Sequence, residues 1–207
     1  MPAHADEKRR PLAAVILSGG ESRRMGAAKA LVPYRGKTFV EHLIEVTRHQ
    51  RVGLTRIVVG AHADEIRDRL AAAHTSEIVV NADWAKGQLS SIQAAIRSLP
   101  DGTDGLILFL IDHPLISISL VNDLIEQFYA TSCAKIVLPV FDTRRGHPVI
   151  FPAALYQELL QAPMDKGARA VVWAHAGDVL SLPTNEEGCV VNLNDPETMR
   201  RATGRSD

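Results

Sequence analysis

The sequence contains little cysteine and no excess of charge of either sign, and each shortage excludes a class of protein. Cys133 and Cys189 are the only cysteines, and they stand 56 positions apart without CxxC spacing. This excludes a cysteine-rich zinc or iron–sulfur module, and we expect both thiols to be reduced and buried. The 23 lysines and arginines balance 24 aspartates and glutamates to a net charge of −1. A nucleic-acid partner that is held by a basic field is therefore not expected.

Long hydrophobic runs are also missing. No uninterrupted apolar run exceeds six residues, as in Leu106 to Ile111, whereas a helix needs about 20 to span a bilayer. The opening segment, Met1 to Pro11, is polar and lacks the apolar centre of a signal peptide. We therefore expect a disordered leader over residues 1–11 and a single domain over residues 12–203. We also expect a cytoplasmic protein with no membrane contact.

Short β-branched runs instead alternate with amphipathic helical stretches along the chain. Leu12 to Leu17 is apolar throughout, as in a strand that is buried on both faces. This alternation predicts an α/β fold, a Rossmann-like and mostly parallel sheet with helices on both faces. The expected strands are 12–17, 56–59, 77–80, 105–111, 135–140, 148–151, 179–182 and 189–193. The expected helices are 38–49, 63–73, 88–99, 153–161 and 166–175. Two more helices are expected, one that is capped by Ser117 or Ser119 and ends near residue 130, and one that begins at Pro196.

Polar clusters follow three of the expected strands, directly after Leu17, Ile111 and Leu193. In open parallel sheets, ligands bind beyond the carboxyl ends of the strands. The three clusters therefore predict one ligand site at this edge of the sheet.

The loop after the first expected strand has the composition of an anion-binding loop. Gly19 and Gly20 allow backbone N–H groups to approach a ligand closely. Arg24 and Lys29 add two cations, and residues 21–37 together carry five basic residues and one acidic residue, a local charge of +4. The loop is neither a Walker A sequence nor GxGxxG. A plain strand-to-helix turn with solvated arginines is the alternative.

Four ordered motifs resemble those of the MobA-like NTP transferases, and most closely the molybdenum cofactor cytidylyltransferase branch. The resemblance extends from Leu12 to about Met199. It implies transfer of a nucleoside monophosphate from an NTP to a phosphorylated acceptor, with release of pyrophosphate. The motifs are Leu-Ser-Gly-Gly-x-Ser-x-Arg-Met-Gly-x-x-Lys from Leu17 to Lys29, the segment from Asn81 to Ser91, Asp112-His113-Pro114, and Gly146-His147-Pro148-Val149.

The resemblance also implies a Mg²⁺ site. The matching aspartate of the family holds the metal, so Asp112 is expected to do so here, and a helix-capping role is its alternative. Asn192 is expected as the second ligand, with Asn194 beside it on the acceptor side. Arg24 and Lys29 are expected to neutralise the rest of the triphosphate charge.

Nucleotide contacts are expected from the loop and from the segment before the helix at 88–99. For Ser90 and Ser91, capping of that helix is the alternative. His147 is expected on the acceptor side, or else in a structural role, and Trp84 is expected to pack over the nucleotide pocket. The residues expected to bind nucleotide are Leu17, Ser18, Gly19, Gly20, Ser22, Asn81, Gly87, Ser90 and Ser91.

Several readings of substrate and role stay open. Gly19 and the Asn192-x-Asn194 ending resemble the guanylyltransferase branch, whereas Gly-Gln-Leu-Ser-Ser and Gly-His-Pro-Val resemble the cytidylyl branch, so CTP ranks before GTP. The expected acceptor is a molybdopterin-type phosphate, with a sugar or alditol phosphate as the alternative. A molybdoenzyme or its chaperone is a possible partner. A cofactor chaperone without turnover is the hypothesis from another class.

Overall fold

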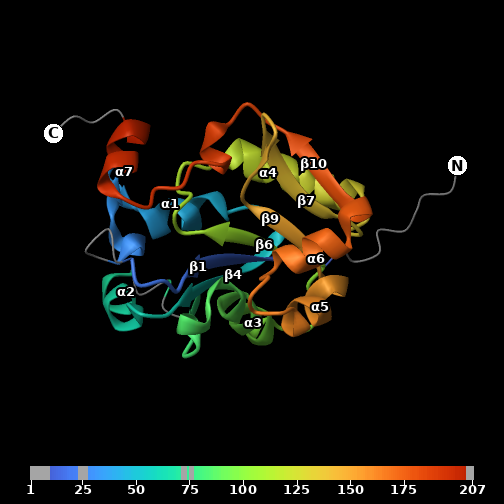
Figure 1. Cartoon of the computed structure of the whole chain (residues 1–207), viewed down its shortest axis with the longest axis horizontal. Helices are drawn as coiled ribbons and strands as arrows, with labels where there is room; N and C mark the ends of the chain where they lie inside the picture. The colour runs from blue at the N-terminus through green and yellow to red at the C-terminus, as the bar shows by residue number, and fades with distance from the viewer. Residues whose placement is uncertain (1–9, 23–27, 71–73, 75–76, 204–207) are drawn as a thin grey trace, which may run out of the picture.

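The computed structural model describes residues 10–22, 28–70, 74 and 77–203, and the strand β1 (Leu12–Ser18) lies at its centre (Figure 1). All seven residues of β1 are buried. The reason is that β1 pairs in parallel with β4 (Val52–Val59) on one side and with β6 (Gly105–Leu110) on the other. The first expected strand is therefore confirmed as a strand that is covered on every side.

The sheet that the described residues form has eight strands. Its order is β10-β7-β9-β6-β1-β4-β5, and β8 pairs with β7. Only β8 and β9 run antiparallel to their neighbours, so the predicted mostly parallel sheet is confirmed. The remaining strands are β5 (Ile78–Val80), β7 (Ile136–Phe141), β8 (Arg144–Arg145), β9 (Val149–Pro152), β10 (Val179–Pro183) and a separate hairpin of β2 (Pro33–Tyr34) and β3 (Lys37–Thr38).

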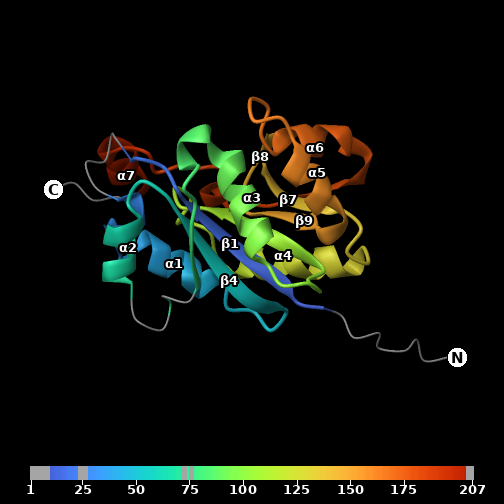
Figure 2. The ribbon, with the colours of Figure 1, turned by 90° about the horizontal axis from the view of Figure 1, so that it is seen from below.

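Helices cover both faces of the sheet, as predicted. Alternate residues of β1 point to opposite faces because side chains alternate along a strand. Leu12, Ala14 and Ile16 belong to the core cluster with α1 and α4, whereas their neighbours belong to the cluster with α3, α5 and α6 (Figures 1 and 2). The helices are α1 (Phe39–Val46), α2 (Ala63–Arg69), α3 (Gln88–Ser98), α4 (Ile118–Ala130), α5 (Tyr156–Gln161), α6 (Arg169–Ala174) and α7 (Pro196–Thr203), with short 3-10 turns at 29–31, 84–86, 153–155, 176–178 and 187–189.

Side-chain caps begin α1 and α4, and at the start of α7 the Asp195 carboxylate accepts from the Thr198 N–H at 2.8 Å. The Thr38 hydroxyl accepts from the Glu41 N–H and the Glu41 carboxylate accepts from the Thr38 N–H, which is a capping box at α1. Ser117 Oγ accepts from the Leu120 N–H at 3.1 Å, so Ser117 and not Ser119 caps α4. α1 and α4 therefore start where hydroxyl side chains satisfy their first N–H groups.

One expected strand is wrong. Residues 189–193 are apolar enough for a strand, but the chain forms a 3-10 turn over Glu187–Cys189 and then runs irregularly. The N–H groups of Val190 and Val191 bond locally to the Glu187 carbonyl oxygen, and Leu193 donates to the Asp112 carbonyl oxygen at 2.7 Å. The segment therefore crosses the ends of the strands and does not extend the sheet.

Other expectations need smaller corrections. α1 ends at Val46 and not near His49, and α2 ends at Arg69. Both cysteines are free as expected, but only Cys189 is buried, whereas Cys133 is half-buried. Most of the predicted leader lies outside the described residues. Within the described part of the chain, no helix is both long and apolar enough to cross a membrane.

The order of the strands reverses beside β1. From β1 the chain moves to β4 and β5 on one side and then returns to β6 on the other. The connections that leave β1 and β6 therefore turn away from each other, and a crevice opens at their carboxyl ends. The first two predicted polar clusters follow these two strands.

Two histidines pack against each other beyond β6. The rings of His113 and His147 have centroids 5.2 Å apart, and neither buried Nδ1 atom has a hydrogen-bond partner among the described residues. Burial, assisted by the nearby His113, lowers the pKa of His147 to about 4. Burial also lowers the pKa of His113. Both rings are therefore neutral at pH 7.

We expect the free energy of unfolding to fall as the pH drops from 6.5 toward 4. The unfolded His147 takes up a proton near pH 6.5, whereas the folded residue resists protonation down to about pH 4, so acid favours the unfolded chain. The contribution of neutral His147 to the free energy of unfolding is fully present above pH 6.5, and about 3 kcal/mol of it is lost at pH 4. Urea unfolding across this range measures the slope.

His147→Gln removes the titrating group and should flatten that slope. The matched control is His175→Gln, because the His175 ring contacts the exposed carboxylate of Glu158 at 2.8 Å and keeps its access to solvent. Equal slopes in the wild type and in His147→Gln would contradict the prediction.

Candidate active site

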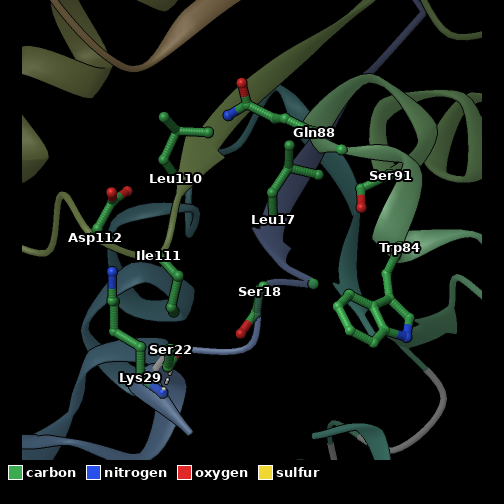
Figure 3. A pocket seen from close by; sticks show the side chains of 13 residues that line it. Leu17, Ser18, Ser22, Lys29, Trp84, Gln88, Ser91, Leu110, Ile111 and Asp112 are labelled. Carbon is green, nitrogen blue, oxygen red and sulfur yellow. Dashed lines mark hydrogen bonds between the residues drawn. The ribbon is translucent and has the colours of Figure 1, made fainter. Parts of the chain in front are cut away.

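A cavity of about 280 Å³ lies at the carboxyl ends of β1 and β6, the edge where the polar clusters predict a ligand site. Figure 3 shows three walls, from the end of β1, from the end of β6 and from the start of α3. A hollow of about 500 Å³ adjoins it and shares four of its residues. The cavity is lined by Leu17, Ser18, Gly19, Gly20, Ser22, Lys29, Trp84, Gly87, Gln88, Ser91, Leu110, Ile111 and Asp112, and the hollow adds Glu21, Ala85 and Asn194.

The loop after β1 passes very close to α3. A β-carbon at Gly19 would lie 2.9 Å from Ser91 Oγ, closer than such contacts occur. A β-carbon at Gly60 would collide with the Gly19 carbonyl oxygen and with the Trp84 side chain. Glycine is therefore required at both positions for backbone to reach the cavity wall.

The first turn of α3 faces the cavity. Gly87 precedes the helix with φ of 103°, a left-handed conformation that suits glycine, and no side chain caps this end. The alternative in which Ser90 or Ser91 caps α3 is therefore wrong. Uncapped N–H groups at the positive end of a helix form a natural anion or polar-ligand site. Ser91 lines the cavity beside them.

Asn81 and Ser90 stand behind this wall. The buried Asn81 donates from Nδ2 to Ser90 Oγ at 2.9 Å and to Ser91 Oγ at 3.0 Å. Its Oδ1 accepts from the Asp83 N–H at 3.0 Å, so both ends of the amide are engaged. Neither Asn81 nor Ser90 lines the cavity or the adjoining hollow. The structure places Asn81 where it orients the Ser91 hydroxyl.

Lys29 joins the loop to the distant C-terminal segment. Its Nζ donates to Asn194 Oδ1 at 2.5 Å, and Asn194 Nδ2 donates to Asn192 Oδ1 at 2.8 Å. The Lys29 N–H also donates to Ser22 Oγ at 3.2 Å. In Figure 3 the Lys29 side chain is directed toward Asp112. The structure thus brings together four of the predicted site residues around one compact cation.

Asp112 follows β6 at the cavity wall. Its carbonyl oxygen accepts from the Leu193 N–H at 2.7 Å, and this bond sets Asn192 and Asn194 beside it. The alternative in which Asp112 caps the following helix is wrong, because Ser117 caps α4. The carboxylate of Asp112 therefore stays available at the cavity.

These groups fit a hard divalent cation. Carboxylate and amide oxygens, as in Asp112 and Asn192, are donors that Mg²⁺ prefers. The described part of the chain contains no cluster of three or more His, Cys, Asp or Glu residues that could hold a metal. A bound Mg²⁺ would therefore complete its shell with phosphate oxygens and water, as is usual for this ion.

The predicted site residues also include Arg24 and His147. Arg24 lies outside the described residues. His147 lines a separate cavity of about 420 Å³ between α3, the sheet and α6, whereas Asn194 lies at the hollow beside Lys29. Among the described residues, the two predicted acceptor contacts therefore belong to different cavities.

Two residues that line the cavity have only a weak signal in the sequence. Trp84 lines both the cavity and the hollow, in line with its expected packing over the pocket. Gln88 was not singled out, although it lines the cavity at the first position of α3. Its place directly after Gly87, in a segment already expected to face nucleotide, was the available signal.

Comparison with known proteins identifies the family. Residues 14–179 match the MobA-like NTP transferase domain. The nicotine blue oxidoreductase of Paenarthrobacter nicotinovorans is 32% identical over 161 residues, covering 75% of this chain and 78% of that protein. The molybdenum cofactor cytidylyltransferase of Escherichia coli K12 is 24% identical over 92% of this chain and 95% of its own. The probable molybdenum cofactor guanylyltransferase of Opitutus terrae is 28% identical over 92% and 94%.

A solved structure supports the fold. The crystal structure of Rv0371c from Mycobacterium tuberculosis has a TM-score of 0.78 at 23% identity, covering 95% of this chain and 100% of that chain. The domain match spans most of the sheet and all three walls of the cavity. The chain therefore belongs to the MobA-like NTP transferase family and is a nucleotidyltransferase.

Proposed function

We propose that the protein is a Mg²⁺-dependent cytidylyltransferase that moves CMP from CTP to a molybdopterin-type phosphate. The observation that carries the proposal is the pairing of Lys29 and Asp112 at one cavity, beside an uncapped helix end and a glycine loop. A triphosphate with Mg²⁺ needs such a combination of cation, carboxylate and N–H donors. Similarity to the Escherichia coli cytidylyltransferase over almost the whole chain adds support.

The reaction needs positioning and charge neutralisation and no side-chain nucleophile. An oxygen of the acceptor phosphate forms a bond to the α-phosphorus of the NTP, the bond from that phosphorus to the bridging oxygen breaks, and pyrophosphate leaves. Lys29, held by Asn194 at 2.5 Å, neutralises phosphate charge. Asp112 and Asn192 would hold Mg²⁺, which supplies further neutralisation when bound. The N–H groups of the loop and of α3 orient the nucleotide.

Four alternatives share part of this evidence. In the first alternative the donor is GTP, if Gly19, Asn192 and Asn194 determine which base is bound. The Opitutus terrae relative is named a probable guanylyltransferase, which supports this alternative. A sugar or alditol phosphate replaces the acceptor, or the protein carries cofactor without turnover to a cytoplasmic molybdoenzyme or its chaperone. In the last alternative the protein is an oxidoreductase, as the Paenarthrobacter relative is named, and the 32% identity to that relative supports this alternative.

A substrate panel tests the proposal. The purified protein is incubated with Mg²⁺, molybdenum-loaded molybdopterin and each of the four NTPs in turn, and pyrophosphate is measured. We expect the fastest release with CTP. Release of pyrophosphate with GTP alone contradicts the assignment of CTP as the donor. Release only when a sugar phosphate replaces molybdopterin contradicts the proposed acceptor. Nucleotide binding without release of pyrophosphate favours the chaperone.

We expect Asp112→Ala to lower turnover by about 100-fold or more, because one charge-stabilising group is lost at the reacting phosphates. The expected defect is in kcat, and raising Mg²⁺ should recover part of it. Asp123→Ala is the matched control, because Asp123 is an exposed aspartate on α4. Wild-type turnover in Asp112→Ala would show that the carboxylate is only structural.

We expect Gly19→Ala to weaken NTP binding about tenfold or more, since the new methyl group would press on Ser91 Oγ at 2.9 Å. The double variant Gly19→Ala with Ser91→Ala removes that oxygen, so it should bind each NTP about as well as Ser91→Ala alone. Gly177→Ala is the control, because a β-carbon there meets nothing within 4 Å and Gly177 lines neither the cavity nor the hollow. Isothermal titration with each NTP measures the affinities, and weaker binding by the double variant than by Ser91→Ala would refute close packing of loop and helix.

A further inference from the structure

A third cavity, of about 420 Å³, lies outside the nucleotide site. It is bounded by α3, by the strands β6, β7 and β9, and by the segment that leads into α6, over the region where Figures 1 and 2 show α6 beside β9. The reaction described above needs a second pocket, for the acceptor, beside the bound nucleotide. Its floor is apolar and is formed by Leu89, Ile92, Leu138, Val149 and Phe151.

An aromatic and a flexible apolar side chain stand at the rim of this cavity. Trp173 on α6 is 59% exposed and Met164 is 44% exposed, and both line the cavity. Exposed tryptophan is costly to leave in water and is a common platform for planar ligands. Together with the floor, these side chains offer flat apolar surfaces to a bound molecule.

The same rim is positively charged. Arg145, Lys166 and Arg169 line the cavity, against the single carboxylate of Asp165. Across the part of the chain that the structure describes, none of these three cations takes part in an ion pair. Three uncompensated cations around one opening attract an anion.

The cavity adjoins the nucleotide site. Gln88, at the first position of α3, lines both spaces. In Figure 3 its side chain extends toward Leu110, at the end of β6. A ligand that enters the third cavity with a phosphate at the Gln88 end would therefore reach the place where the nucleotide is bound.

We infer that this cavity binds the acceptor, as a phosphate monoester whose body is a planar ring system, with Trp173 and the cations Lys166 and Arg169 as specificity determinants. This inference rests on the proposed transferase function and deepens it. Sugar and alditol phosphates expose hydroxyl groups on every face, and an apolar floor would leave them without hydrogen-bond partners. A planar heterocycle instead matches both the floor and the tryptophan.

Steady-state kinetics test the assignment. We expect Trp173→Ala, and separately the double variant Lys166→Ala with Arg169→Ala, to raise KM for molybdopterin about tenfold. KM for the NTP should change less than twofold, because none of these residues lines the nucleotide cavity. The matched controls are Ile118→Ala, an exposed apolar residue on α4, and Arg97→Ala, an exposed arginine on α3. An unchanged KM for molybdopterin in both test variants overturns the inference while leaving the transferase function intact.

A binding measurement without turnover separates the two claims. Trp84→Phe leaves Trp173 as the only tryptophan of the chain. We expect flavin mononucleotide, a planar phosphate monoester, to quench its fluorescence, and glucose 1-phosphate at the same concentration to leave it unchanged. If flavin mononucleotide quenches the fluorescence but the protein releases no pyrophosphate, the cavity assignment is supported and the proposed transferase function is contradicted. Equal responses to the two phosphates, or none to either, overturn the cavity assignment.

Discussion

The parallel pairing of β1 with β4 and β6 is the constraint on which the site depends. Because β1 is buried along its whole length between two parallel neighbours, its register determines where each strand ends. Ser18 and Leu110 therefore finish at the same edge of the sheet, and the polar residues that follow them open toward one crevice. Loss of this pairing would separate the glycine loop from Asp112, although no residue of either had changed.

A second set of contacts brings in residues from the far end of the chain. The Leu193 N–H bonds to the Asp112 carbonyl oxygen, and Asn194 accepts from Lys29. These bonds use the backbone and two short side chains, so they hold the C-terminal segment at the strand ends without a strand of its own. The cost of ordering this segment is offset by the burial of Leu193 against Tyr34 and Phe39.

The nearly neutral composition conceals an uneven distribution of charge. Lys29 serves the nucleotide cavity, whereas Arg145, Lys166 and Arg169 surround a different one. Both substrates of a nucleotidyl transfer are anions that repel each other. If the acceptor binds in the third cavity as inferred, Lys29 on one side of Gln88 and the three cations on the other would reduce that repulsion.

The sequence by itself determined the order of most elements and the chemistry of the site. Apolar runs such as Leu12 to Leu17, the paired glycines and the proline after Asp112 act locally, through propensity and backbone freedom. It failed at residues 189–193, where four apolar residues and Asn192 resemble a strand until the hydrogen-bond partners are known. Only the tertiary structure decided that Asn81 donates to the Ser91 hydroxyl and that segments between Gln88 and Trp173 enclose a third cavity, which His147 lines. Those contacts join residues far apart in the chain, and their geometry depends on strand register and helix packing, which no local pattern encodes.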